Sequence, residues 1–243
     1  MEEKWYGFKL SKFIFEEHEA IIVFPNKSGN LNLAVKTEYW GAFPQAVETS
    51  LLDNGFTLCY IKNDNRWGMD SDLERKARFI KHVQRQYGLN PQCVLVGMSC
   101  GGLIAIKIAA KYPELVSCLY LDAPVLNYMS CPCGFGVGVP LNDNLDEILD
   151  ALSLDNVSEL LAYRDMPLDY LKKLVENYIP AVMVAGADDS ITPYCENGVF
   201  LERAYREAGV PIEVHMKPGC GHHPHGLEKN EPVLKFIEKY TKV

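Results

Sequence analysis

Short apolar segments alternate with longer amphipathic segments along most of this chain. Residues 70–87 are of the second kind, because Leu73, Ala77, Ile80 and Val83 recur at intervals of three and four with charges between them. Short apolar segments instead predict strands, and the continuous apolar runs at residues 20–24 and 93–96 predict strands buried on both faces. The predicted strands cover residues 20–24, 56–61, 93–96, 116–121, 181–185 and 211–217, and the predicted helices cover residues 43–54, 70–87, 103–110, 195–208 and 232–240.

The alternation of strands with helices predicts an α/β fold with a mostly parallel, twisted sheet and helices on both faces. Residues 26–37 are predicted as a loop, and residues 5–15 as one or two edge strands. The segment at about 127–178 breaks the rhythm with two further helical patterns, at 145–152 and 157–163. We expect one domain over residues 1–243, with this segment inserted as a small cap or lid.

Composition narrows the classes of function. The 243 residues are 48% apolar and carry a formal net charge of −8, without the basic patch that a nucleic-acid partner requires. No stretch approaches the roughly 20 apolar residues of a membrane span, and the first seven residues lack the apolar core of a secretion signal. We therefore expect a cytoplasmic protein that contacts neither nucleic acid nor membrane. The composition leaves the oligomeric state open.

The junction between the strand at 93–96 and the helix at 103–110 leaves almost no residues for a loop. Gly97, Ser99 and Gly101 form the pattern G-x-S-x-G there, which places a serine at the apex of a sharp strand-to-helix turn. The amide of Cys100 would then point at an oxygen bound to Ser99, and the helix dipole would favour negative charge at that position. This is the expected geometry of a serine nucleophile with its first oxyanion donor.

An acidic and a basic residue follow two later strands. Asp189 lies in the loop after the strand at 181–185, and His222 lies in the loop after the strand at 211–217. Ligands of open α/β sheets bind beyond the carboxyl ends of the strands, so these loops and Ser99 should converge. We predict that Ser99 attacks the substrate, His222 accepts its proton and Asp189 orients His222.

Other residues in these loops are alternatives. Asp188 is the nearest rival for the acid, and Asp122, just after the strand at 116–121, is a more distant one. His223 and His225 are alternative bases. The same histidines with Cys131 and Cys133 could in principle bind zinc. We favour the triad because the zinc site needs a lid and a distant loop to converge, and we expect no metal and no organic cofactor.

The remaining site predictions concern the oxyanion and the pocket. The second oxyanion donor should follow the strand at 20–24, at the amide of Asn26 or Lys27. Trp40, Trp67 and Tyr128 are candidates to line a sugar-binding or acyl pocket, since aromatic faces stack on apolar ring surfaces. Trp67, in a polar loop after a strand, is the strongest of the three.

The chain resembles the α/β-hydrolase superfamily, and within it a bacterial group of carbohydrate-esterase-like and prolyl-oligopeptidase-like hydrolases. The acid and the histidine occupy the positions that are typical of the superfamily. Asp189 lies three residues after Gly186 and four before Pro193, and His222 follows a Gly-x-Gly turn. The group often has Arg-Gly after the serine and Trp at position 131, where this chain has cysteines. The resemblance rests on residues 97–102, 120–125, 130–132, 186–193, 196–197 and 217–227, the last with the sequence GHHPH at 221–225.

The resemblance implies an esterase acting on acylated sugars. We expect a serine hydrolase that cleaves a small carboxylic ester through an acyl-enzyme on Ser99. One alternative is an amidase or peptidase with the same triad. The other is a catalytically idle protein of this fold that binds a small ligand.

Overall fold

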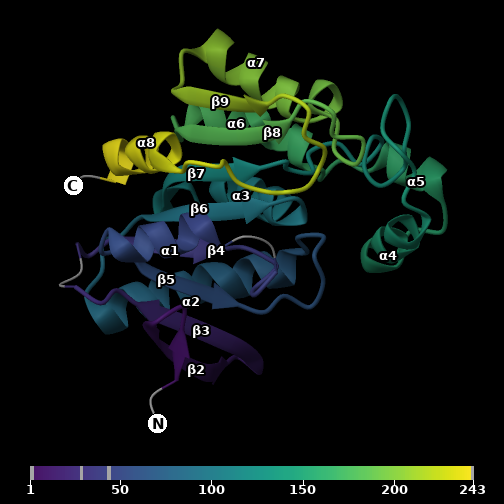
Figure 1. Ribbon diagram of the computed structural model, residues 1–243. Helices are drawn as coiled ribbons and strands as arrows, with labels where there is room; N and C mark the ends of the chain where they lie inside the picture. The colour runs from purple at the N-terminus through teal and green to yellow at the C-terminus, as the bar shows by residue number, and fades with distance from the viewer. Residues whose placement is uncertain (1–2, 28–29, 43–44, 242–243) are drawn as a thin grey trace.

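The computed structural model describes residues 3–27, 30–42 and 45–241, whose strands form one nine-stranded sheet in the order β1-β2-β3-β5-β4-β6-β7-β8-β9 (Figure 1). The four strands β1, β2, β3 and β5 pair antiparallel, whereas β5, β4, β6, β7, β8 and β9 pair parallel. The bounds are β1 Lys4–Trp5, β2 Phe8–Phe15, β3 His18–Phe24, β4 Leu33–Lys36, β5 Thr57–Ile61, β6 Cys93–Met98, β7 Val116–Asp122, β8 Ala181–Gly186 and β9 Ile212–Lys217.

Helices cover both faces of this sheet. Figure 1 shows α1 and α8 in front of it and α3 behind it, while α4 and α5 project at the right, away from the sheet. The bounds are α1 Ala46–Asp53, α2 Asp70–Tyr87, α3 Cys100–Lys111, α4 Asn142–Leu152, α5 Val157–Ala162, α6 Leu171–Glu176, α7 Gly198–Ala208 and α8 Glu231–Thr241, with short 3₁₀ turns η1 Pro113–Leu115, η2 Pro167–Tyr170 and η3 Tyr194–Glu196.

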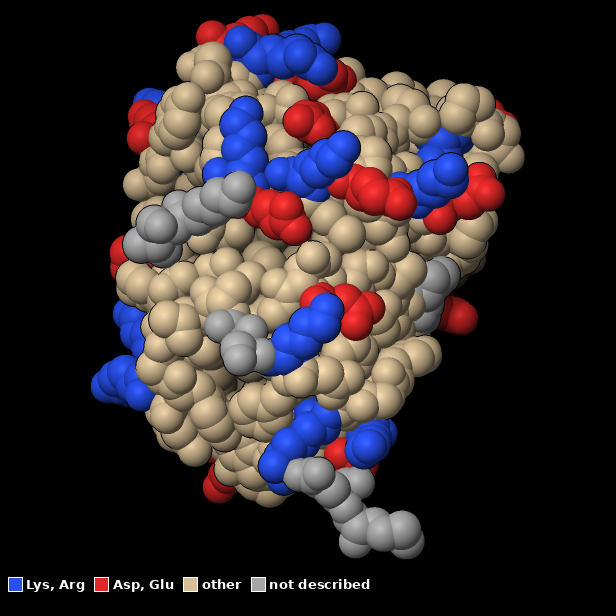
Figure 2. All heavy atoms as spheres, turned by 60° about the vertical axis from the view of Figure 1, so that its left-hand side comes forward, with Lys and Arg blue, Asp and Glu red and all other residues tan. Residues whose placement is uncertain are grey.

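Charged side chains of both signs are spread over the surface. On the side shown in Figure 2, lysines and arginines lie next to acidic residues over a largely uncharged background. Among the residues coloured there, basic side chains do not merge into the continuous positive surface that binds a nucleic-acid backbone.

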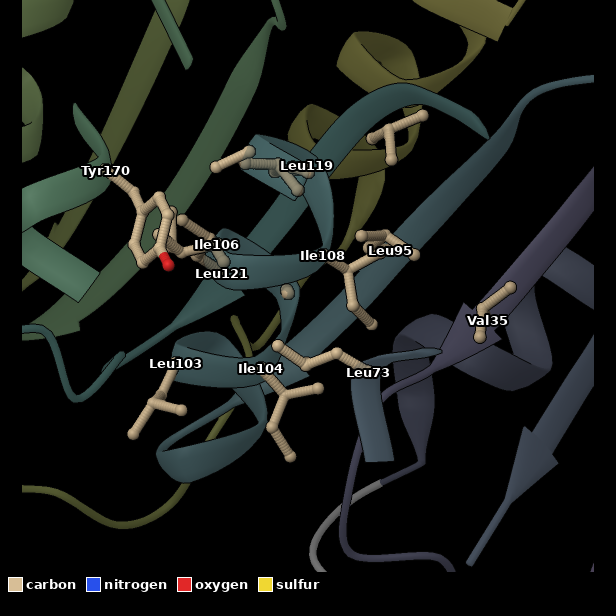
Figure 3. Close-up of a cluster of buried hydrophobic side chains, with 14 of the residues drawn as sticks. Val35, Leu73, Leu95, Leu103, Ile104, Ile106, Ile108, Leu119, Leu121 and Tyr170 are labelled. Atoms are coloured by element: carbon tan, nitrogen blue, oxygen red, sulfur yellow. The ribbon is translucent and has the colours of Figure 1, made fainter. Parts of the chain in front are cut away.

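The core divides into two layers because successive strand residues point to opposite faces. Ile21 and Val23 pack with α1 and α8, whereas their neighbours Ala20 and Ile22 pack on the side of α2 and α3. Helix α3 is buried over residues 100–110, so it is apolar almost all round, as a central helix must be. Figure 3 shows its Leu103 and its three isoleucines among side chains from β4, β6 and β7.

The predicted fold class is confirmed, and the long elements lie where the pattern placed them. Helix α2 spans Asp70–Tyr87 as predicted. The predicted helix at 43–54 begins at Ala46 in the described part, since residues 43 and 44 lie outside it. The predicted helix at 195–208 is divided at Asn197 into η3 and α7. Within the described residues, no helix has the length and apolar character needed to cross a membrane.

One strand was missed. Residues 26–37 were predicted as a loop, yet Leu33–Lys36 forms β4 between β5 and β6. The strand has only four residues and ends in a lysine, which reads as a surface position. Lys36 is in fact 1% exposed, and its ammonium donates hydrogen bonds to Gln45 and Glu48 inside the protein. The buried ion pair allows a charged residue to end a central strand.

Charged contacts fasten the segment between β7 and β8 (residues 123–180, the β7–β8 segment) to the rest of the molecule. Arg66, after β5, forms a two-pronged ion pair with Glu147 of α4. The ammonium of Lys107 in α3 lies 2.6 Å from the carboxylate of Asp165. These ion pairs, at the middle of α4 and just after α5, therefore tie the projecting helices to the rest of the molecule.

Candidate active site

Ser99 is the one residue between strand β6 and helix α3, and its backbone is strained. Its φ is +52° and its ψ is −120°, in the left-handed half of conformational space that residues other than glycine avoid. A Cβ on Gly97 would lie 2.6 Å from the carbonyl oxygen of Gly101, and one on Gly102 would lie 2.5 Å from Cβ of Pro124. The small residues of the predicted motif are therefore required by the close approach of strand, helix and the loop after β7.

The structure brings Ser99, His222 and Asp189 into one hydrogen-bonded chain. Nε2 of His222 lies 3.2 Å from Oγ of Ser99, and Nδ1 of His222 lies 2.8 Å from Oδ2 of Asp189. The three residues come from the carboxyl ends of β6, β9 and β8, as predicted for an open parallel sheet. This geometry allows a proton to pass from the serine hydroxyl to the imidazole while the carboxylate stabilises the imidazolium.

Backbone and side-chain donors hold the carboxylate of Asp189 in place. The amides of Ile191 and Thr192 donate to its Oδ1 at 2.8 and 2.9 Å, and the Thr192 hydroxyl donates to Oδ2 at 2.8 Å. Burial alone would raise the pKa of Asp189, but the hydrogen bond and charge of His222, together with Thr192, outweigh it and set the pKa at about 2. The group is therefore an anion at any ordinary assay pH.

The alternative acids lie elsewhere. Asp188 is exposed beside the buried Asp189. Asp122 is buried but contacts a different histidine, since its Oδ1 lies 2.9 Å from Nδ1 of His225. Its Oδ2 accepts hydrogen bonds from the phenol of Tyr120 and the amide of Gly226.

The two oxyanion predictions have different outcomes. Cys100 is the first residue of α3, so its amide lies at the helix N-terminus beside Ser99, as predicted. Asn26 and Lys27 are exposed and lie at the opposite end of the sheet, because β3 runs antiparallel to β5. The prediction that one of them donates to the oxyanion is therefore wrong, and its cause is the missed strand β4.

The loop after β4 occupies the place that was assigned to Asn26 and Lys27. The hydroxyl of Thr37 donates to the carbonyl oxygens of Val96 and Gly101, at 3.0 and 2.7 Å, and so joins this loop to the turn around Ser99. Two residues later, the phenol of Tyr39 lies against the thiol of Cys100. Burial raises the pKa of Tyr39 far above its usual value, so the phenol keeps its proton and remains a hydrogen-bond donor.

The aromatic residues predicted to line a pocket have other surroundings. Trp67 and Tyr128 are fully buried and pack edge to face, with ring centroids 6.3 Å apart. The prediction that they face a cleft is wrong, because a polar loop sequence does not reveal that its tryptophan turns inward. Trp40 is half-buried and stacks with Trp5 and Tyr60, toward the core layer shared with α1 and α8.

The candidate metal ligands separate into two groups. In the part of the chain that the structure describes, His222, His223 and His225 gather with their ligand atoms within 4.8 Å of one another. Cys131 and Cys133 are buried and do not join that group. The mixed cysteine–histidine zinc site considered from the sequence is therefore not formed.

Comparisons with known proteins agree with the architecture. Residues 66–132 match the family model described as alpha/beta hydrolase fold, and this range contains β6, Ser99 and α3. A search of curated proteins by sequence gave no match.

Among solved structures, the chain is similar to acylaminoacyl peptidase from Pyrococcus horikoshii, with a TM-score of 0.75 and 15% identity over 97% of this chain and 42% of that one. It is also similar to puromycin hydrolase, with a TM-score of 0.70 and 16% identity over 95% of this chain and 38% of that one. TT1662 from Thermus thermophilus matches along nearly its whole length, with a TM-score of 0.67 and 16% identity over 97% of this chain and 99% of that one.

The chain thus spans less than half the length of the two enzymes named for their substrates, and about the whole length of the third protein. The strand order, the turn at Ser99, the family model and these structural neighbours together show that this chain has the α/β-hydrolase fold.

Proposed function

We propose that the protein is a serine hydrolase that cleaves a small carboxylic ester through an acyl-enzyme on Ser99. One observation carries the proposal: the strained serine at the N-terminus of α3 lies 3.2 Å from an imidazole whose other nitrogen lies 2.8 Å from a buried carboxylate. A serine hydroxyl is a weak nucleophile at neutral pH, and this arrangement is the one that activates it.

The residues have separate tasks in the reaction. Oγ of Ser99 attacks the carbonyl carbon while Nε2 of His222 takes its proton, and Asp189 stabilises the resulting imidazolium. Collapse of the tetrahedral intermediate breaks the bond to the leaving alcohol, which receives the proton from His222. A water molecule then attacks the acyl-enzyme in the same way, and the carboxylic acid leaves.

The negative oxygen of the tetrahedral intermediate needs two donors. The amide of Cys100 is the first, supported by the dipole of α3. We assign the second to Tyr39, whose phenol lies against Cys100 and stays protonated because it is buried. The loop carrying Tyr39 is fixed to the turn by the two hydrogen bonds of Thr37.

The exposure of the reacting groups bears on the substrate class. Ser99 is 9% exposed and the side chain of His222 is 9% exposed, so access is narrow and favours a small acyl group. The resemblance to carbohydrate-esterase-like hydrolases favours an acylated sugar. The second candidate is an amide or peptide bond, because two structural neighbours are named as a peptidase and as puromycin hydrolase.

A matched substrate panel separates these candidates. The wild type and Ser99→Ala are assayed with p-nitrophenyl acetate and butyrate, acetylated glucose and xylose, and acyl and aminoacyl p-nitroanilides. We expect turnover of the acetyl esters, lost in Ser99→Ala at unchanged thermal stability. Turnover confined to the anilides would assign an amidase. No turnover of either class, with a ligand that raises the melting temperature, would favour the idle binding protein.

A further inference from the structure

The loop after β9 places three imidazole rings around one point. The ring centroids of His222, His223 and His225 lie 4.9–5.1 Å apart in every pair, and the ring planes meet at 76–89°. Their ligand nitrogens lie within 4.8 Å of one another. The hydrolytic reaction uses only the first of these three rings, so the arrangement of the other two needs its own explanation.

Carboxylates orient two of the rings. Asp189 accepts from Nδ1 of His222 at 2.8 Å, and Asp122 accepts from Nδ1 of His225 at 2.9 Å. Because a carboxylate can only accept, each neutral ring carries its hydrogen on Nδ1 and its lone pair on Nε2. A histidine whose second nitrogen donates to a carboxylate is the arrangement found at protein metal sites, where the carboxylate fixes the ring and raises its basicity.

We propose that His222, His223 and His225 bind a divalent transition-metal ion of the Zn²⁺ type, and that this ion reversibly blocks hydrolysis. Three imidazole nitrogens suit Zn²⁺ and Cu²⁺, whereas Mg²⁺ and Ca²⁺ require oxygen ligands. With Zn–N bonds of about 2.0–2.1 Å, a tetrahedral ion needs its ligands roughly 3.3 Å apart. The exposed His223 can turn its side chain toward the other two rings, and a water molecule takes the fourth position.

Charge supports the same conclusion. Asp122 and Asp189 are 1% and 6% exposed, and each lies directly behind one of the ligand rings. Their two negative charges would balance the two positive charges of the ion once it is bound.

Inhibition follows because the metal ion and the proton of Ser99 would use the same nitrogen, Nε2 of His222. This half of the proposal rests on the proposed hydrolase function. The lone pair on Nε2 of His222 is the one that must accept the proton of Ser99. A metal ion on that lone pair leaves the serine without a base. Removal of the ion by a chelator restores the free imidazole and therefore the activity.

Binding is tested first, in a form that needs no catalysis. Ser99→Ala, carrying Cys195→Ser and Cys220→Ser to remove the two cysteines that are not buried, is titrated with Zn²⁺ by calorimetry and with Co²⁺ by visible absorption. We expect one Zn²⁺ per chain and the intense visible bands of a four-coordinate Co²⁺ site. Loss of a residue that only supports a metal ligand weakens metal binding by about 10- to 100-fold. His223→Ala removes a ligand itself, so it should weaken Zn²⁺ binding by at least about tenfold. His215→Ala, which removes an imidazole outside the cluster, should bind as before.

Inhibition is then measured on the wild type with its best ester substrate. Zn²⁺ should lower kcat, and EDTA should restore it. The concentration giving half-inhibition should rise by at least about tenfold in His223→Ala, a variant that keeps Ser99, His222 and Asp189 intact. Absence of stoichiometric Zn²⁺ binding, or equal binding by His223→Ala, would overturn the metal site. Binding without any hydrolase activity would leave the site standing and remove the proposed function instead.

Discussion

The carboxylate of Asp122 lies 2.9 Å from Nδ1 of His225, and this buried pair stands beside the similar pair of Asp189 and His222. The ring centroids of the two histidines are 4.9 Å apart. Asp122 also accepts from the phenol of Tyr120 and the amide of Gly226, so it fastens the histidine loop to the end of β7. The two carboxylates are therefore expected to differ sharply in what their loss does.

Asp189→Asn should lower kcat by about 10³- to 10⁴-fold, because the amide stabilises the wrong tautomer of His222. Asp122→Asn should instead lower the free energy of unfolding by about 1–3 kcal/mol, since it disturbs buried hydrogen bonds, and leave kcat within about tenfold. Steady-state kinetics and urea unfolding measure both effects. Asp188→Asn is the matched control, as Asp188 is exposed. A loss of kcat in Asp122→Asn as large as that in Asp189→Asn would contradict the assignment of the acid.

Ser99 and His222 should behave as one unit. Either single substitution to alanine removes the activated nucleophile, so Ser99→Ala, His222→Ala and the double variant should share nearly the same residual rate. Independent losses that multiply in the double variant would mean that the two side chains act in separate steps.

Tyr39→Phe tests the second oxyanion donor. The substitution keeps the ring and removes the hydroxyl, and we expect kcat to fall by about 10²- to 10³-fold with little change in KM. Tyr178→Phe, at a position 59% exposed, serves as the control. Unchanged kcat in Tyr39→Phe would contradict this assignment of the second donor.

Glu196 is expected to hold part of the β7–β8 segment against the sheet. Its carboxylate accepts from the hydroxyl of Ser130 at 2.7 Å and from the amides of Val137 and Gly138. Burial raises the pKa of Glu196, but these three hydrogen bonds outweigh it and the pKa lies below its usual value. The contact is therefore complete above about pH 4.5 and is lost as the pH falls through the lowered pKa.

Glu196→Ala should speed amide hydrogen exchange and proteolytic cleavage within residues 130–140, whereas Glu207→Ala on the exposed side of α7 should not. The wild type should show the same loosening at acidic pH. Equal exchange in both variants would mean that the loop is held by its own packing.

Lys76 gives a stability test in the alkaline range. The side chain is fully buried, with its nitrogen 2.9 Å from the carbonyl oxygen of Ile61, and burial lowers its pKa to about 8 from 10.5. Between these values the unfolded chain binds a proton that the folded chain does not, so the contribution of Lys76 to stability rises with pH.

The free energy of unfolding of the wild type, relative to Lys76→Met, should therefore increase by about 2–3 kcal/mol from pH 8 to pH 10. Lys81→Met, on the exposed face of the same helix, should show no such trend. A difference that is flat between these pH values would mean that Lys76 keeps its proton in the folded protein.

The parts of the fold that sequence alone predicts are those with a strong periodic signal. Helix α2 has five turns of regular spacing, and its bounds agree with the prediction. Strand β4 carries only four residues, and its last one, Lys36, is charged, so its place in the middle of the sheet depends on a distant partner, Glu48. An ion pair between residues that are distant in the sequence produces no local sequence pattern from which the strand could be predicted.

The same division applies to the site. Ser99, Asp189 and His222 could be selected because each follows a recognisable strand, and the order of strands brings their ends together. The prediction of the oxyanion loop was wrong because the true loop follows β4, a strand that the sequence pattern did not reveal. The prediction for Trp67 was wrong for a different reason. Polar neighbours indicate a loop, but they do not indicate whether one side chain of that loop points inward, as Trp67 does.

The central claim is that His222 makes the hydroxyl of Ser99 a nucleophile. Intact-mass spectrometry after incubation with a fluorophosphonate tests it directly, because attack by the serine oxygen on phosphorus expels fluoride and leaves a stable adduct. We expect one phosphonyl group per chain in the wild type, none in Ser99→Ala, and strongly slowed labelling in His222→Ala. A wild type that stays unlabelled, or a Ser99→Ala variant that is labelled as fast as the wild type, would contradict the account.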